Sequence, residues 1–345
     1  MRRSRRILIV TVLAVALCAG LSWVLLGAAH RALDTPLQLS RAERFEVTSG
    51  ASAAAVARQL AGRGWLEHPR VWTWYARWTG RADKLKAGYY SLSPGETPRT
   101  LLEEMVAGRV MLEQVTIIEG WTYRDLRRAL ADQPGVRQTL AGRSDEAVMT
   151  SLGAAGVHPE GQFFPDTYRF AYGTPDLEVL RLAYDRMRSE LTQAWGARTP
   201  VAGIATPYQA LTLASLVEKE SARADERPRI AGVYVRRLQL GMRLQADPTV
   251  IYGLGASYDG DLRTRDLRTD GPYNTYTRTG LPPTPIALPG RASLLAATRP
   301  QVTGAIFFVA TGEPDGSHYF STTLAEHNAA VRRLLARQRT GGQTR

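Results

Sequence analysis

The stretch LTLASLVEKESA, residues 211–222, combines seven uncharged residues with two closely spaced carboxylates, Glu218 and Glu220. The preceding TPYQ (residues 206–209) places a threonine before a proline, with a glutamine three residues after the threonine. That order forms a capping box with proline at the first helical position. The sequence therefore predicts a helix from Pro207 to about Ser221 that is apolar along its length and acidic at its end.

The two carboxylates are expected to point in different directions. Successive helical residues are rotated by about 100°, so Glu218 and Glu220 lie about 200° apart and cannot form a side-by-side pair. No cation on the same helix lies three or four residues from Glu218, whereas Arg223 lies three residues after Glu220. Burial without a cation raises the pKa of a carboxyl group. We therefore expect Glu218 to be the proton donor near neutral pH; the alternative is that both side chains are solvated at a helix end.

The N-terminus predicts a membrane anchor. MRRSRR is followed by 23 uncharged residues, Ile7–Ala29, enough to cross a hydrocarbon core of about 30 Å at about 1.5 Å per residue. Arginines precede this run and no comparable cluster follows it, which places residues 1–6 in the cytoplasm and the bulk of the chain outside. A cleaved signal peptide is the alternative, but its apolar region is usually only about 7–15 residues long.

Composition excludes several other classes of function. The formal net charge is +12, yet no compact Lys/Arg block with interleaved aromatic residues indicates nucleic-acid binding. The only cysteine, Cys18, lies in the apolar run, so no disulfide or thiol chemistry is expected in the exported part. The five histidines show no metal-binding spacing, and the chain has no serine-hydrolase or phosphate-loop motif. We therefore expect neither a metal nor a cofactor.

Three short repeats indicate how the first half is organised. SGAS (residues 49–52), PGET (94–97) and EGWT (119–122) each follow a strand-like run and precede apolar residues at a spacing of four. This pattern predicts a strand, a glycine turn, and a helix capped by the hydroxyl group. Such β–α units favour a compact binding module; three unrelated capped helices are the alternative. Residues 30–44 are interpreted as a linker.

In the second half, 175–195 and 227–240 are predicted to be helices and 242–253 an extended segment. Residues 305–311 are predicted to be a buried strand, and 318–337 a strand followed by a helix. The tail, 338–345, is expected to be disordered.

Four motifs resemble the endolytic murein transglycosylases of the MltG (YceG-like) family: ASLVEKES (214–221), ERPRIAGVYVRRLQLGMRLQADPTVIYG (226–253), YNTYTRTGLPP (273–283) and EGQFFPDTY (160–168). The resemblance covers nearly all of the chain after the apolar run. It implies an α+β fold with an N-terminal transmembrane helix (7–29), a small LysM-like βαβ module (45–110) and a mixed α/β catalytic domain (111–337). Ala246 departs from the family's threonine, and Gln162 and Phe164 stand where the family often has larger aromatic residues.

The resemblance also implies a function. The family cleaves peptidoglycan glycan strands within the chain, leaves 1,6-anhydro-N-acetylmuramic acid ends, and is tied to strand termination at the inner membrane, with membrane peptidoglycan synthases as partners and no cofactor. Carried over, Glu218 is the catalytic residue and Glu220 supports it. The expected sugar-cleft residues are Gln245, Asp247, Thr249, Tyr252, Asn274 and Tyr276.

A single carboxyl group is sufficient for that reaction. A glycoside hydrolase needs two carboxylates, one as acid and one as base or nucleophile. A lytic transglycosylase uses no water, so one group can serve first as acid and then as base. Two alternatives remain: a true muramidase with Asp247 as the partner carboxylate, and a non-catalytic anchor that binds peptidoglycan through residues 45–110.

Overall fold

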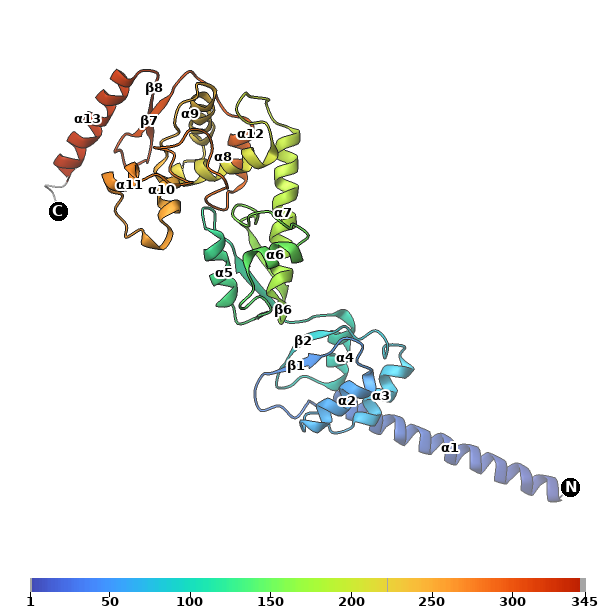
Figure 1. The fold of residues 1–345 in the computed structure, drawn as a ribbon. Helices are drawn as coiled ribbons and strands as arrows, with labels where there is room; N and C mark the ends of the chain where they lie inside the picture. Colours follow the sequence, from blue (N-terminus) through green and yellow to red (C-terminus); the bar gives the residue numbers. More distant parts are fainter. Residues whose placement is uncertain (1, 222, 342–345) are drawn as a thin grey trace. The chain divides into compact units, whose positions relative to one another are not determined.

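The structure is a computed structural model that describes residues 2–221 and 223–341. It divides into two compact units. The first holds the chain up to Glu113 together with Phe170–Gly173, and the second holds Gln114–Arg169 and the chain from Thr174 onward. Helices and short two-stranded sheets occur together in the chain (Figure 1), which confirms a mixed α+β fold with an apolar N-terminal helix.

The first unit is built on one antiparallel strand pair covered by helices. β1 pairs with β2 with Phe45 opposite Tyr90, and both rings are buried with Trp72. Two helices separate the strands, so the predicted β–α–β order is corrected to β–α–α–β. The elements in chain order are α1 (Arg2–Asp34), β1 (Glu43–Val47), α2 (Ala53–Gly62), α3 (Pro69–Trp78), β2 (Gly88–Leu92) and α4 (Pro98–Ala107).

The three predicted strand–turn–helix units are all present. They are β1 with α2, β2 with α4, and β3 (Leu112–Thr116) with α5 (Tyr123–Ala131). Each helix is capped by the expected hydroxyl group, which accepts a hydrogen bond from the backbone N–H three residues on. Each turn glycine has a left-handed φ, which only glycine adopts without strain. The capping residues are Ser52, Thr97 and Thr122.

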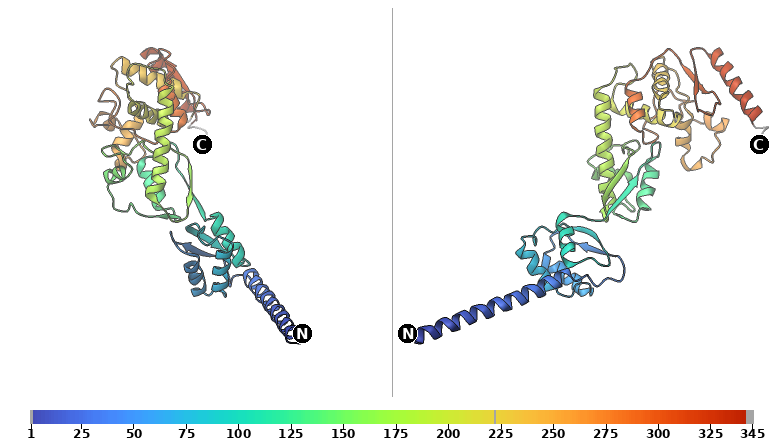
Figure 2. Two further views of the ribbon diagram at one scale, coloured as in Figure 1. Left: turned by 90° about the vertical axis from the view of Figure 1, so that its right-hand side faces the viewer. Right: turned by 180° about the vertical axis from the view of Figure 1, so that it is seen from behind.

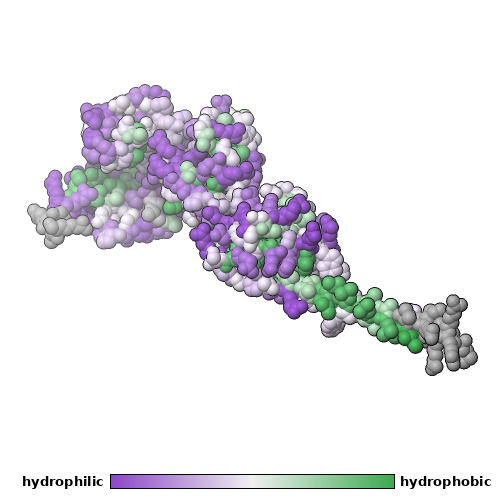
Figure 3. All heavy atoms as spheres, turned by 90° about the horizontal axis from the view of Figure 1, so that it is seen from below, coloured by the Kyte–Doolittle hydropathy of each residue, from purple (hydrophilic) through white to green (hydrophobic). Residues whose placement is uncertain are grey.

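The start of the predicted linker belongs instead to the first unit. α1 continues to Asp34, and both Leu33 and Leu37 are buried in the core of this unit. Arg99 on α4 donates a hydrogen bond of 2.7 Å to Asp34. Residues 11–34 are long and apolar enough to cross a membrane, and no part of their most apolar stretch is buried. Figure 2 shows α1 extending away from the rest of its unit, and its apolar character is visible in Figure 3.

The second unit is organised around α8, which α7, α9 and α12 contact. Leu211, Leu213, Leu216 and Val217 on α8 are completely buried. The strands β3 and β5 (Thr167–Ala171) each have residues in both units. Besides α5, the other elements of the second unit are β4 (Val136–Arg137), α6 (Asp145–Ser151), β6 (Thr174–Pro175), α7 (Asp176–Gly196), α8 (Pro207–Glu220), α9 (Arg227–Gln239), α10 (Asp247–Leu254), the 3₁₀ turn η1 (Gly255–Ser257), α11 (Thr264–Arg268), α12 (Arg291–Thr298), β7 (Phe307–Ala310), β8 (His318–Ser321) and α13 (Leu324–Gly341).

The predicted capping box of α8 is confirmed, since Thr206 and Gln209 cap each other's backbone groups. The predicted extended segment at 242–253 is wrong, because most of it forms α10. Pro248 stands in the first turn of that helix, where proline is favoured. β7 is only partly buried, which corrects the expectation of a buried strand. Of the predicted disordered tail, Gln338–Gly341 is the last turn of α13, and the remainder lies outside the described residues.

Candidate active site

Glu218 lies in a buried ion pair. Arg227 Nη2, from the start of α9, donates a hydrogen bond of 2.9 Å to one carboxylate oxygen, and the backbone N–H of Gly290 donates one of 2.8 Å to the other. The side chains of Glu218 and Arg227 are only 4% and 7% exposed. The expectation that Glu218 lacks a cation is therefore wrong. Its partner lies nine residues away in sequence, on the next helix, where no helical spacing rule reveals it.

The same ion pair holds neighbouring segments to the end of α8. Glu119 of the EGWT turn lies 3.9 Å from Arg227, and burial, followed by the charge of Glu218, raises the pKa of Glu119. A Cβ atom at position 290 would lie 1.8 Å from a Glu119 oxygen, so this close approach requires glycine. Lys219 also donates to the carbonyl of Gly120 at 3.2 Å. The contacts on this side of the end of α8 therefore hold the EGWT turn and the segment at Gly290 against the helix.

Glu220 has a different environment. Its carboxylate accepts a hydrogen bond from the hydroxyl group of Tyr234, a buried residue of α9. Burial and the charge of Asp247 raise the pKa of Glu220 to about 7, against the lowering effect of the Tyr234 hydrogen bond. The predicted partner Arg223 instead forms salt bridges with Asp225 and Asp315. Glu220 therefore has the property that the sequence assigned to Glu218: a carboxyl group that is half protonated near neutral pH.

Two predicted cleft residues, Asp247 and Tyr276, interact electrostatically with Glu220, and a third, Gln245, bonds to Arg237. Asp247, the first residue of α10, accepts a hydrogen bond from the hydroxyl group of Tyr276, and the charge of Glu220 acts on that tyrosine. Gln245 adopts a left-handed φ of 53°, the only described non-glycine residue to do so. Its side-chain oxygen accepts a 3.1 Å hydrogen bond from Arg237. Gln245 and Asp247 are exposed, and Tyr276 and Glu220 partly so, which makes the group accessible.

Thr249 and Asn274, two further predicted cleft residues, are buried and hydrogen-bonded within the second unit. Thr249 is fully buried and its hydroxyl group bonds to Ala246 O and Thr275 Oγ1. Asn274 is 5% exposed. Its amide nitrogen donates to three backbone carbonyl groups, and its oxygen accepts from the backbone N–H of Tyr276 at 2.8 Å. Asn274 thus shapes the loop that presents Tyr276.

Tyr252 is linked to a carboxylate that the sequence did not single out. Its hydroxyl group donates a 3.0 Å hydrogen bond to Glu160, which also accepts one of 2.9 Å from the backbone N–H of Tyr123. Burial raises the pKa of Glu160 to about 7. Glu160 is the first residue of the EGQFFPDTY motif. That position was the only feature of the sequence that could have identified it as a candidate site residue. Tyr234 and Arg227 were likewise missed, although both lie in quoted motifs.

The groups of this site that can transfer protons near neutral pH are its carboxyl groups. Among the described residues, no group of three or more His, Cys, Asp and Glu side chains is placed to hold a metal ion. A carboxyl group with a pKa of about 7 can donate a proton and accept one at the same pH. Glu220 and Glu160 have this property, and of the two residues only Glu220 is partly exposed; the charge of the exposed Asp247 acts on it.

Comparison with known proteins places the chain in a family. Over 309 residues it is 30% identical to an endolytic murein transglycosylase from Bacillus subtilis (strain 168), covering 85% of this chain and 84% of that protein. It is 26% identical to an endolytic murein transglycosylase from Streptococcus pneumoniae serotype 2, covering 87% of this chain and 60% of that longer protein. The crystal structure of a YceG-like protein from Listeria monocytogenes matches 84% of this chain and 99% of its own, with 28% identity and a TM-score of 0.52. The model of the YceG-like family matches residues 45–333, and the chain belongs to that family.

Proposed function

We propose that this protein is a membrane-anchored endolytic lytic transglycosylase that cleaves peptidoglycan glycan strands and leaves 1,6-anhydro-N-acetylmuramic acid ends. The names of the relatives support the reaction class. The observation that carries the proposal is Glu220, a partly exposed residue whose carboxyl group is held by the Tyr234 hydroxyl group near the exposed Asp247 and whose pKa burial raises to about 7. Such a group suits a reaction in which one residue gives and then takes back a proton.

We assign the catalytic role to Glu220 and a positioning role to Glu218. The sequence argument for Glu218 depended on a carboxyl group without a cation, and that criterion selects Glu220 once the partners are known. Both oxygens of Glu218 are held, one in the buried ion pair with Arg227 and the other by the backbone N–H of Gly290. No ion pair involves Glu220 among the described residues, and its only hydrogen-bond donor there is the neutral hydroxyl group of Tyr234.

The proposed reaction has two proton transfers. Protonated Glu220 gives its proton to the glycosidic oxygen as the bond between that oxygen and the anomeric carbon breaks. The 6-hydroxyl oxygen of the same N-acetylmuramic acid attacks the anomeric carbon, and its proton passes to the Glu220 carboxylate. The ring closes as a 1,6-anhydro sugar, and the enzyme returns to its starting state without consuming water.

Gln245, Asp247 and Tyr276 are proposed to hold the sugar at this site. The oxygen of Gln245 is occupied by Arg237, so its amide nitrogen can donate to an N-acetyl or hydroxyl oxygen. The Asp247 carboxylate is proposed to stabilise a developing oxocarbenium ion by its negative charge. It also disfavours early ionisation of Glu220, because like charges repel.

A hydrolytic muramidase is the second candidate, and Asp247 is the observation in its favour. A hydrolase uses a second carboxylate to activate water or to form a covalent intermediate. Mass spectrometry of fragments released by the full-length protein from sacculi separates the two, because an anhydro end is one water lighter than a reducing end. Anhydro products from both the native protein and Asp247→Asn would support the transglycosylase. Reducing ends from the native protein would establish the hydrolase, and the absence of fragments despite binding would establish a non-catalytic anchor.

We propose that residues 45–110 form a LysM-like module that binds the glycan and that 111–337 form the catalytic domain. Deletion of 45–110 is expected to weaken binding to sacculi more than it slows cleavage of soluble glycan fragments. Equal loss of both would place the module within the catalytic core. The proposed topology is a single pass through the inner membrane, with the N-terminus in the cytoplasm and the catalytic domain in the periplasm. There the protein would terminate nascent strands beside membrane peptidoglycan synthases.

A further inference from the structure

Two exposed tryptophans on α3 have no role in the proposed reaction. Trp74 is 47% exposed and Trp78 is 70% exposed. Their rings are stacked, with centroids 5.6 Å apart and an angle of 5° between the planes. A spacing of four places them on one face of α3, while Trp72, Tyr75 and Ala76 of the same helix are buried. A contiguous, solvent-exposed apolar surface of this kind indicates an interaction site.

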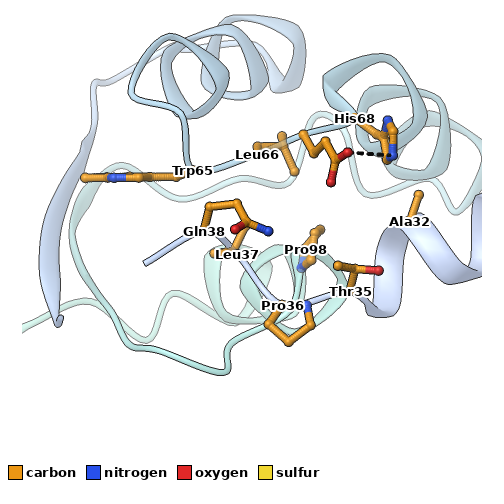
Figure 4. A pocket seen from close by; sticks show the side chains of 10 residues that line it. Ala32, Thr35, Pro36, Leu37, Gln38, Trp65, Leu66, His68 and Pro98 are labelled. Atoms are coloured by element: carbon orange, nitrogen blue, oxygen red, sulfur yellow. Dashed lines mark ion pairs between the residues drawn. The ribbon is translucent and has the colours of Figure 1, made fainter. Parts of the chain in front are cut away.

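α3 lies against the end of the apolar helix. Arg99 on α4 joins the two, because its guanidinium group donates to Asp34 at the end of α1 and to the hydroxyl group of Tyr75 on α3. Leu33 is buried in the same core. Figure 4 shows Ala32 and Thr35 at the end of α1 beside Leu66, His68 and Pro98. The α1–α3 junction is therefore a packed and hydrogen-bonded part of the first unit.

This junction lies close to the expected membrane surface. The apolar run ends at Ala29, and the four residues from there to Leu33 advance a helix by about 6 Å. The headgroup layer on each side of the hydrocarbon core is roughly 5–8 Å thick. A helix that contacts the end of α1 therefore lies at headgroup depth if α1 spans the bilayer.

The charges on α3 suit a lipid surface. Arg70 and Arg77 are both exposed, and neither forms an ion pair within the described part of the chain. The helix itself, PRVWTWYARW, contains no acidic residue. Tryptophan concentrates at the boundary between headgroups and hydrocarbon, and exposed arginines there bind anionic phosphates.

We propose that α3 is an interfacial helix that docks on the bilayer beside α1, with Trp74 and Trp78 inserted among the lipid headgroups and Arg70 and Arg77 bound to anionic phosphates. The inference rests on the proposed anchoring by α1. A glycan ring is the other natural partner of stacked tryptophans, but the position beside the end of an apolar helix and the unpaired arginines favour lipid. This second contact would fix the tilt of the first unit on the membrane.

The test uses the full-length protein reconstituted into vesicles of zwitterionic and anionic phospholipid. An environment-sensitive fluorophore is attached to native Cys18 or, in a C18S background, to R70C on α3 or S49C as a control. Ser49 is exposed in the turn between β1 and α2, and R70C keeps both tryptophans and Arg77. We expect blue-shifted emission and quenching by nitroxide-bearing lipids at 18 and 70, and water-like emission at 49. Trp74→Ser with Trp78→Ser is expected to return the probe at 70 to water-like emission.

Each result has a distinct meaning. A lipid signal at 18 with water-like emission at both 70 and 49 overturns the docking of α3 and leaves the anchor intact. Water-like emission at 18 overturns the anchor itself. A lipid signal at 70 that survives loss of both tryptophans refutes their role. A probe at 70 that responds to soluble peptidoglycan fragments and not to lipid identifies the pair as a sugar platform and refutes membrane docking.

Discussion

Replacing each glutamate at the end of α8 by glutamine separates their proposed roles. Glu220→Gln keeps the size of the side chain but can neither donate nor accept the proton. General acid–base assistance is typically worth about 10²–10⁴-fold. Because one residue serves both transfers here, release of anhydro-ended fragments is expected to fall by about 10⁴-fold. Glu218→Gln is expected to keep measurable activity in the molecules that remain folded.

The stability of the two variants is expected to change in opposite directions. Glu218→Gln keeps an acceptor oxygen for Arg227 but removes the negative charge of the buried pair; the other partners of Arg227 are the Ser221 carbonyl at 3.3 Å and Glu119 at 3.9 Å. Breaking a buried ion pair costs about 3–5 kcal/mol, and these remaining contacts favour the lower value. A cost of about 3 kcal/mol lowers Tm by roughly 6–12 °C for a domain of about 150–250 residues.

For Glu220→Gln the size of the change in the free energy of unfolding depends on pH. Its pKa rises from 4.5 to about 7 on folding. The stability that the protonated form contributes is therefore complete below about pH 4.5 and is lost as pH rises through 7. Glutamine does not ionise and keeps this contribution at every pH. Glu220→Gln is therefore expected to have the same free energy of unfolding as the native protein at pH 4.5. Above pH 7 it is expected to be more stable by up to about 3 kcal/mol.

The assay combines mass-resolved release of anhydro fragments from sacculi with thermal melts of the same full-length samples at pH 4.5 and 8. The pH dependence of the native rate is a further check, because kcat/KM is expected to fall about tenfold per pH unit above 7. Near-normal release by Glu220→Gln, together with complete loss by a Glu218→Gln protein that melts normally, would refute the assignment. Normal release by both variants would refute a single-carboxyl mechanism on this helix.

Three further results are expected. Tyr234→Phe removes a hydrogen bond that lowers the pKa of Glu220, so the alkaline limb of the kcat/KM profile is expected to move to higher pH; an unchanged profile would contradict the proposed coupling. Asn274→Ala leaves three backbone carbonyl groups without their donor and is expected to cost about 2 kcal/mol in a thermal melt. A raised KM at unchanged stability would instead restore Asn274 as a sugar ligand. A reporter enzyme fused after Arg345 is expected to be active only outside the cytoplasm, and cytoplasmic activity would reverse the proposed topology.

The features that the sequence predicted well depend on interactions between residues close together in the chain. The hydroxyl caps of α2, α4 and α5 and the capping box of α8 depend on residues within three positions of each other. The capping box at Thr206 identified the uncharged run before Glu218 as a helix, and the run's apolar character predicted its burial. α10 was missed because the β-branched residues of DPTVIY favour an extended chain when judged alone. In the structure, the buried Thr249 and Val250 pack the helix into the second unit, and packing overrides propensity.

The site was harder to predict because ionisation depends on contacts between distant segments. Helical geometry correctly separated the two glutamates but could not supply Arg227, which arrives from the following helix, or Gly290, 72 residues away. Adding Arg227 to the argument is what moves our proposed catalytic role from Glu218 to Glu220. Thr249 and Asn274 show the same limit, since a motif identifies polar residues but not the direction in which their side chains point.

The buried ion pair between Glu218 and Arg227 also explains how Glu220 is held. Glu220 is the last residue of α8, and helix ends fray unless their final turn is bound. Glu218 fastens that turn to α9 through Arg227 and to the start of α12 through the N–H of Gly290. The carboxyl group two residues later then faces Tyr234 and Asp247 without a cation of its own. A buried ion pair on one side of the helix end and a carboxyl group of raised pKa on the other are thus complementary parts of one arrangement.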